Sequence, residues 1–126
     1  MNEDTRTDRW LWIGGLLVVL LTIAAHARGL SGQFLEWDDY GHITQNPVIR
    51  SLSPANLWSM FTEPAAKLYV PLTWLSFAID YQMWGRDPFG YHLTNLLLHV
   101  ANTVLVMLFA FQLLRGRFEH ANRRRF

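Results

Sequence analysis

A long uncharged run constrains the fold more than any other feature of the sequence. It extends from Leu93 to Leu114, about 22 residues, without a single Asp, Glu, Lys or Arg. A helix needs about 20 mainly apolar residues to cross the hydrocarbon core of a bilayer, so this run can span it with some tilt. Three aromatic residues precede the run, where an interfacial belt is expected: Trp84, Phe89 and Tyr91. We predict a transmembrane helix over residues 89–114.

A second apolar run lies near the N-terminus, over residues 10–27. It is close to the lower limit of length for a membrane span. A signal peptide is the alternative, since Arg6 and Arg9 would form its basic region and Ala25-His26-Ala27 has the small-x-small pattern of a cleavage site. We favour an uncleaved membrane anchor, which makes the expected fold class all-α and integral to a membrane.

The composition agrees with a membrane protein. Apolar residues make up 51% of the chain and charged residues only 17%, below the quarter that is typical of soluble domains. The net charge of +1 indicates no nucleic-acid partner. The chain has no cysteine, which excludes disulfides, thiol catalysis and thiolate metal ligands.

The distribution of positive charge predicts the topology. Seven of the 11 Lys and Arg residues flank the two spans on the terminal side, and four are spread over the long connecting segment. The positive-inside rule therefore places residues 1–9 and the basic tail 115–126 in the cytoplasm. The tail, with Arg123, Arg124 and Arg125, also suits anionic lipids. We expect a hairpin in a bacterial inner membrane, with residues 28–88 as an extracytoplasmic loop.

Two short helices are predicted within this loop. Ser53 and Pro54 form an N-cap and a first helical residue, so a helix is expected at about 54–61. Pro71 opens another at about 71–84, in which Thr73, Ser76 and Asp80 are spaced to share one helical face. The second helix is too short to span and very apolar, so we expect both helices at the membrane interface. A third full span over 71–84 is the alternative.

An acidic pair follows the first span, in the sequence Trp37-Asp38-Asp39-Tyr40. Adjacent carboxylates at a membrane surface can bind a divalent cation, or one can act as a base while the other orients it. The alternative is a solvated turn, which a bare Asp-Asp pair also fits. Spacing does not separate these interpretations.

A polar stripe runs along the second span. His92, Asn95, His99 and Asn102 are spaced to lie on one face of a helix, and polar groups in lipid require protein partners. His92 and His99 are roughly 10 Å apart along the axis and cannot chelate one ion together. We expect this face to make hydrogen bonds to other membrane subunits. Axial ligation of a haem or pigment by His99 is the alternative.

Three segments in order resemble a known family: FLEWDDYGHITQNPVI, YVPLTWLSFAIDYQMWG and FGYHLTNLLLHVANTVL. Together they are similar to the N-terminal part of GT-C membrane glycosyltransferases, in the protein-O-mannosyltransferase-like branch that often carries tetratricopeptide repeats. The resemblance covers residues 34–114. It implies that Asp38 is the base that activates an acceptor hydroxyl and that Asp39 assists it or helps to hold a metal. It also implies a polyprenyl-phosphate sugar as donor, with no nucleotide.

Enzymes of that family have many more membrane helices, and the later ones build the donor pocket. We therefore expect the chain to be non-catalytic alone and to have an accessory or structural role in a larger membrane complex. The first alternative is the front part of a split or truncated glycosyltransferase. The second is a pigment- or haem-binding hairpin.

Overall fold

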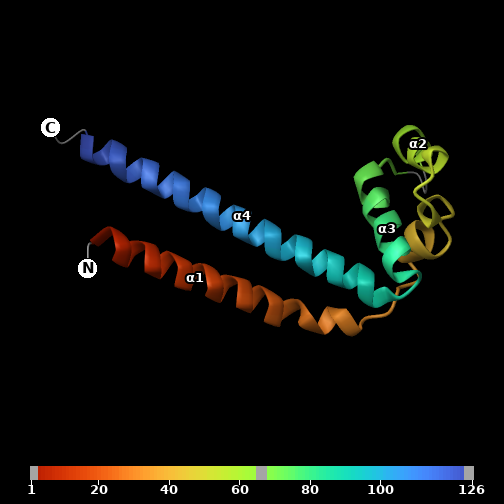
Figure 1. The fold of residues 1–126 in the computed structure, drawn as a ribbon, viewed down its shortest axis with the longest axis horizontal. Helices are drawn as coiled ribbons and strands as arrows, with labels where there is room; N and C mark the ends of the chain where they lie inside the picture. Colours follow the sequence, from red (N-terminus) through yellow and green to blue (C-terminus); the bar gives the residue numbers. More distant parts are fainter. Residues whose placement is uncertain (1–2, 65–67, 124–126) are drawn as a thin grey trace. The chain divides into compact units, whose positions relative to one another are not determined.

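The computed structural model describes the backbone of residues 3–64 and 68–123 and the side chains of residues 9–64 and 68–113. The side chains of Arg6, Lys67 and the basic tail, which the topology prediction uses, lie outside the described set. The described residues form helices and connecting loops, without a β-strand (Figure 1). The predicted all-α class is therefore confirmed.

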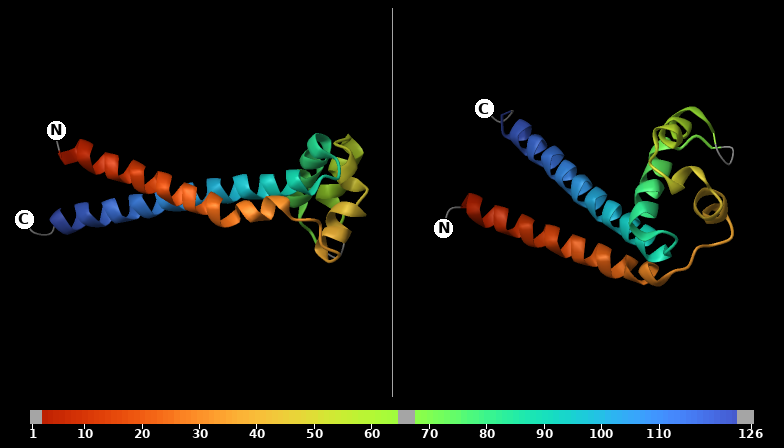
Figure 2. Two further views of the ribbon diagram at one scale, coloured as in Figure 1. Left: turned by 90° about the horizontal axis from the view of Figure 1, so that it is seen from below. Right: turned by 45° about the vertical axis from the view of Figure 1, so that its right-hand side comes forward.

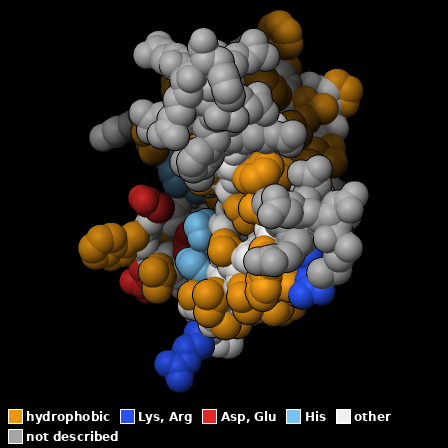
Figure 3. Space-filling model, turned by 90° about the vertical axis from the view of Figure 1, so that its left-hand side faces the viewer, with side chains coloured by type: hydrophobic (Ala, Val, Ile, Leu, Met, Phe, Trp, Pro, Cys, Tyr) orange, Lys and Arg blue, Asp and Glu red, His pale blue; other side chains and the backbone are white. Residues whose placement is uncertain are grey.

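Two helices are long and apolar enough to cross a membrane. The candidate spans are Arg9–Ser31 and Pro88–Leu113, each with a mean hydropathy of 2.0. The first comprises most of α1 (Glu3–His26) and the 3₁₀ helix η1 (Ala27–Ser31), and the second belongs to α4 (Pro88–Arg123). Many of their large apolar side chains are exposed, as expected for helices that face lipid. Figure 3 shows hydrophobic side chains over much of the visible described surface.

The chain divides into two compact units. The first contains α1 and the part of α4 from Leu96 onward, and the second contains residues 28–95. In the first unit the helices approach at Gly15, where an added Cβ would lie 2.9 Å from the Met107 Cε atom. Gly15 is buried and has no side chain, which lets Met107 fill the space against the α1 backbone.

In the second unit four short helices pack together beside the start of α4 (Figure 2). These are the π-helical turn η2 (Tyr40–Thr44), the 3₁₀ helix η3 (Val48–Arg50), α2 (Pro54–Thr62) and α3 (Pro71–Trp84), with α3 in contact with both η3 and α2. Each contributes to a core that consists of Ile43, Ile49, Met60, Trp74, Ala78 and Tyr91. The segment after the first span is therefore a packed unit rather than an open linker.

Local sequence explains where α2 and α3 begin and end. The Ser53 hydroxyl accepts a 3.3 Å hydrogen bond from the Asn56 amide and caps α2. Both helices begin with proline, whose fixed φ suits the first helical position. α3 ends at Gly85, where φ is +63°, a value that favours glycine. The two short helices predicted in this segment are present, and their location at a membrane interface stays a prediction. With 14 residues, α3 is too short for the alternative of a third span.

The polar residues of α3 differ in exposure, which their spacing on one helical face does not indicate. Thr73 is exposed and Ser76 is half-buried, whereas Asp80 is only 3% exposed. Asp80 can enter the core because the Thr94 hydroxyl donates a 2.6 Å hydrogen bond to its carboxylate. The spacing of these residues on one helix does not reveal that partner.

Candidate functional site

The acidic pair lies at the N-terminal edge of η2, and its two members have different surroundings. The Asp39 Oδ2 atom accepts a 2.9 Å hydrogen bond from the Leu35 amide, and Asp39 is half-buried. Asp38 is exposed. The bond from Leu35 closes a short turn and holds the backbone on which Asp38 sits. Asp39 therefore stabilises the local turn through its hydrogen bond, while the carboxylate of Asp38 is accessible to a ligand.

The segment that carries the pair is anchored before it by an aromatic contact. The ring of Phe34 packs edge-on against Tyr91, with 5.2 Å between ring centroids, and Phe77 of α3 contacts the same Tyr91 ring. The Tyr91 hydroxyl donates a 2.9 Å hydrogen bond to the Gly85 carbonyl. Since Tyr91 is buried in the core of the unit, Phe34 fixes the start of the acidic segment to α3 and α4.

A second anchor follows the pair. The Trp74 Nε1 atom donates a 3.2 Å hydrogen bond to the Nδ1 atom of His42, in η2. His42 Nδ1 must therefore be unprotonated, which places the proton of the neutral ring on Nε2. Ile43, the next residue, is buried in the core. Residues 34–43 are thus held at both ends, with the acidic pair between the anchors.

Hydrogen bonds also connect the end of η2 to η3 and α3. Arg50 donates from Nη2 to the Thr44 carbonyl at 3.3 Å, and its own carbonyl accepts a 3.1 Å bond from the Gln82 amide. The buried Asn46 accepts from the Val48 amide at 3.0 Å. These bonds connect the end of η2 to η3 and α3, so the acidic segment is part of the packed unit.

The open carboxylate is surrounded by exposed apolar side chains. Leu35 and Tyr40 are exposed, and Trp37 has 89% of its surface accessible. An exposed Trp next to exposed Leu and Tyr is typical of a surface that meets another protein or the headgroup region of a membrane. The site therefore combines one accessible acid with an apolar rim.

The predicted polar stripe of the second span divides into two parts. His92 is half-buried against the turn at Gly32, where an added Cβ would lie 3.1 Å from His92 Nε2. Within the described part of the chain this buried Nε2 atom has no hydrogen-bond partner. Asn95, His99 and Asn102 are all exposed. The structure thus leaves three polar side chains exposed on a helix of membrane length, and their contact with partner helices stays a prediction.

His99 has a neighbour that the sequence pattern did not indicate. Its ring lies 4.5 Å from that of His26 between centroids, with the two planes tilted by 53°. His26 is the last residue of α1. In the sequence, His26 stands out only as the middle residue of the small-x-small motif Ala25-His26-Ala27. The signal that could have identified the pair is that both histidines are in the predicted spans, His26 within one turn of the connecting segment and His99 about three turns from it.

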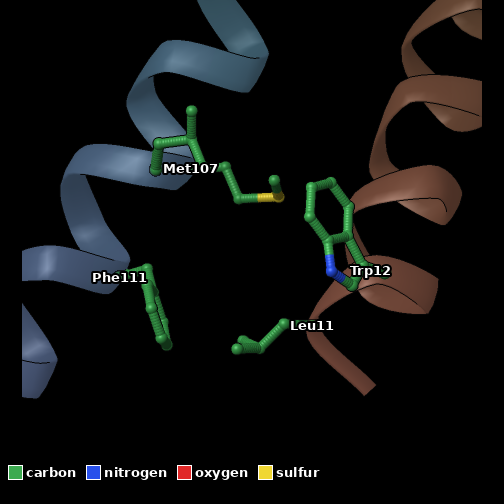
Figure 4. Close-up of a pocket in the computed structure, with 5 residues that line it drawn as sticks. Leu11, Trp12, Met107 and Phe111 are labelled. Carbon is green, nitrogen blue, oxygen red and sulfur yellow. The ribbon is translucent and has the colours of Figure 1, made fainter. Parts of the chain in front are cut away.

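A small apolar pocket lies between the helices of the first unit. Its volume is about 180 Å³, and it is lined by Leu11, Trp12, Met107, Leu108 and Phe111. Figure 4 shows the Trp12 indole directed toward the Met107 thioether, with Leu11 and Phe111 below them. The lining contains no charged group, so the pocket offers space for an apolar chain but no site for chemistry.

The described residues do not by themselves complete a site for a divalent cation. Within them, no group of three or more His, Cys, Asp or Glu side chains is arranged to hold a metal ion. The Oδ2 atom of Asp39 is bonded to the Leu35 amide, so Oδ1 of Asp39 and the exposed carboxylate of Asp38 are the oxygens that the pair could offer. Hard cations such as Mg²⁺ and Ca²⁺ require several oxygen ligands. The role of Asp38 and Asp39 as metal ligands therefore stays a prediction, and no step is derived through a metal.

Comparison with known proteins identifies relatives that are all described as protein O-mannosyl-transferases. The chain is 32% identical over 117 residues to "Protein O-mannosyl-transferase TMTC4" of Mus musculus, covering 86% of this chain and 16% of the relative. It is 54% identical over 101 residues to "Protein O-mannosyl-transferase tmtc2" of Xenopus laevis, covering 74% and 12%. For "Protein O-mannosyl-transferase Tmtc3" of Drosophila melanogaster the identity is 38% over 79 residues, covering 56% and 8%.

The chain thus spans at most 16% of the length of these three relatives. No family model and no solved structure matches it. These relatives confirm the resemblance to protein-O-mannosyltransferase-like glycosyltransferases that the three sequence segments indicate.

Proposed function

Because the chain is homologous to protein O-mannosyl-transferases of the TMTC type, we propose that it is a membrane segment of a glycosyltransferase assembly of the GT-C kind. In this proposal its extracytoplasmic loop presents Asp38 to an acceptor hydroxyl, and further membrane helices supply the donor pocket. The observation that carries the proposal is the arrangement of the acidic pair. Asp38 is exposed on a segment held at both ends, whereas Asp39 is tied to the Leu35 amide.

The proposed reaction assigns one role to each carboxylate. The acceptor oxygen attacks the anomeric carbon of a mannosyl residue on a polyprenyl phosphate, and the bond to the phosphate oxygen breaks. Asp38 takes the proton that the hydroxyl loses, and the polyprenyl phosphate leaves with its negative charge. Asp39 positions Asp38 through the turn that its bond to Leu35 closes. The products are a mannosylated acceptor and a free polyprenyl phosphate.

The apolar rim supports placement of this segment at a membrane surface. Leu35, Trp37 and Tyr40 are exposed beside the acidic pair, and Trp and Tyr are enriched at headgroup depth. A polyprenyl-phosphate donor keeps its lipid in the bilayer, so its phosphate and sugar lie at the same depth. This placement accords with a hairpin whose termini are cytoplasmic. A bacterial inner membrane remains the predicted location.

The exposed polar side chains of α4 favour a second candidate function. Asn95, His99 and Asn102 lie on a helix apolar enough to span a membrane, where unpaired polar groups are costly. In this alternative the chain is an accessory or structural subunit, and these side chains bond to helices of a larger complex. It requires no chemistry at Asp38.

One experiment separates the two functions. The chain is purified with its membrane partners in mild detergent, and mannosyl transfer from polyprenyl-phosphate mannose to a hydroxyl-bearing peptide is measured. If Asp38 is the base, Asp38→Asn lowers kcat by about 100-fold or more while the partners are still co-purified. Glu36→Gln is the matched control, because Glu36 is an exposed acid of the same segment, and it leaves the rate unchanged.

Asp39→Asn tests the division of roles. An Asn carbonyl oxygen can still accept the hydrogen bond from the Leu35 amide, so a positioning role predicts a loss of only a few-fold. Asp39→Ala removes the acceptor and is expected to lower the rate further. An unchanged rate in Asp38→Asn would exclude the catalytic proposal and leave the accessory function.

A further inference from the structure

The imidazole rings of His26 and His99 lie beside each other in the first unit, with their planes tilted by 53°, and neither takes part in the proposed mannosyl transfer. Their centroids are 4.5 Å apart, and both side chains are exposed. His26 ends α1, and His99 lies in α4. Two histidines from separate candidate spans thus meet on a surface that the described residues leave uncovered.

A hydrogen bond fixes the state of the His26 ring. Its Nδ1 atom lies 3.0 Å from the Thr22 carbonyl oxygen. A carbonyl can only accept, so Nδ1 must carry the proton and donate it, and the neutral ring keeps a lone pair on Nε2. Histidines that bind metal ions commonly donate their second ring nitrogen to a carbonyl or carboxylate in this manner. His26 is therefore held in the tautomer that a metal ion requires.

The separation of the rings fits a shared ion. Imidazole nitrogens bind Zn²⁺ at about 2.0–2.1 Å, so each ring centroid lies about 3.2 Å from the ion. Two such rings on adjacent coordination positions have centroids about 4.5–5.2 Å apart, for angles at the metal of about 90–110°. The observed 4.5 Å lies at the lower end of this range. We propose that His26 and His99 together bind one divalent transition-metal ion.

The two imidazole nitrogens determine which metal ions the site would prefer. Imidazole nitrogen suits Cu²⁺, Ni²⁺ and Zn²⁺, whereas Mg²⁺ and Ca²⁺ prefer oxygen, and Cu²⁺ is held most tightly of the series. Two protein ligands leave the other positions of the ion to water or to a further ligand.

Copper binding tests the proposal directly. The chain in detergent micelles is titrated with Cu²⁺, and electron paramagnetic resonance counts the coordinated nitrogens. The proposal predicts one tight equivalent with two imidazole nitrogens, and a loss of affinity of about 10-fold or more in His26→Ala and in His99→Ala. His120→Ala is the control, because His120 is a histidine of the C-terminal tail, and it leaves the affinity unchanged.

Loss of Cu²⁺ binding can be distinguished from misfolding of a variant, and its measurement does not depend on whether the proposed function is correct. His26→Gln and His99→Asn keep a polar side chain, and far-UV circular dichroism shows whether each variant retains its helices. A folded His26→Gln or His99→Asn variant that binds Cu²⁺ as tightly as the parent chain overturns the proposal. A spectrum with a single coordinated nitrogen also overturns it. Neither readout involves mannosyl transfer.

Discussion

The Thr94 hydroxyl donates a 2.6 Å hydrogen bond to the carboxylate of Asp80, and so joins α3 to the first turns of α4. Asp80 is almost fully buried, and removal from water disfavours its charged form. Burial therefore raises the pKa of Asp80, and the hydrogen bond from Thr94 partly offsets that rise. The bond connects the short helices of the second unit to the start of the second candidate span.

Asp80 makes the stability of the second unit depend on pH. Its pKa is raised in the folded state, so the folded chain binds a proton more readily than the unfolded chain. The contribution of Asp80 is fully present below its ordinary pKa of 3.8 and is lost as pH rises through the raised value. Asp80→Asn, which still accepts from Thr94, is expected to remove this dependence and to raise Tm by a few degrees at neutral pH. Thermal melts at several pH values check it, and an unchanged pH profile would contradict it.

Trp74 is predicted to contribute strongly to stability because it is 1% exposed and bonded to His42. Trp74→Phe removes the Nε1 donor and leaves His42 Nδ1 without this partner, which should cost about 1–3 kcal/mol in the free energy of unfolding. Trp58→Phe is the control, since Trp58 is 72% exposed and should change stability by less than about 0.5 kcal/mol. Chemical denaturation in micelles, followed by circular dichroism, measures both. Equal effects would contradict the packing described for Trp74.

The contact between α1 and α4 is predicted to depend on Gly15. A Cβ there meets only the flexible end of Met107, so Gly15→Ala should be tolerated. Gly15→Leu is larger and should separate the helices, whereas Gly14→Leu should not, because an added Cβ at Gly14 meets nothing within 4 Å. The chain has no cysteine, so His26→Cys with His99→Cys can be cross-linked by a short bismaleimide. A several-fold lower yield in Gly15→Leu alone is the expected result, and equal yields in both leucine variants would refute it.

The positive-inside rule predicts that residues 28–88 are outside the cytoplasm. A cysteine in place of the exposed Glu36 should react with a membrane-impermeant maleimide in intact cells. A cysteine in place of Thr7 should react only after permeabilisation. The reverse pattern would show that the orientation is inverted, and labelling at both positions would show that the chain does not cross the membrane as a hairpin.

The sequence alone indicated the two helices long and apolar enough to cross a membrane and the two short helices between them. A bilayer offers no hydrogen bonds to the backbone, so length and apolar composition suffice to identify spans such as Pro88–Leu113. Local signals also suffice for the short helices, because a cap such as Ser53 and a helix-opening proline such as Pro71 act within one turn. Three segments in a fixed order were enough to indicate the glycosyltransferase relationship that the relatives confirm.

Only the tertiary structure decided which polar side chains are paired. Helical spacing placed Asp80 on a polar stripe, yet it is buried because Thr94, on another helix, supplies its hydrogen bond. The spacing along the second span also indicated that His99 and His92 cannot bind one ion together, but it did not indicate that the His26 ring lies beside His99. Within the acidic pair, the bond from Leu35 distinguishes Asp39 from the exposed Asp38. Such pairings depend on how the backbone brings separate segments together, and periodicity within one element carries no information about a partner on another.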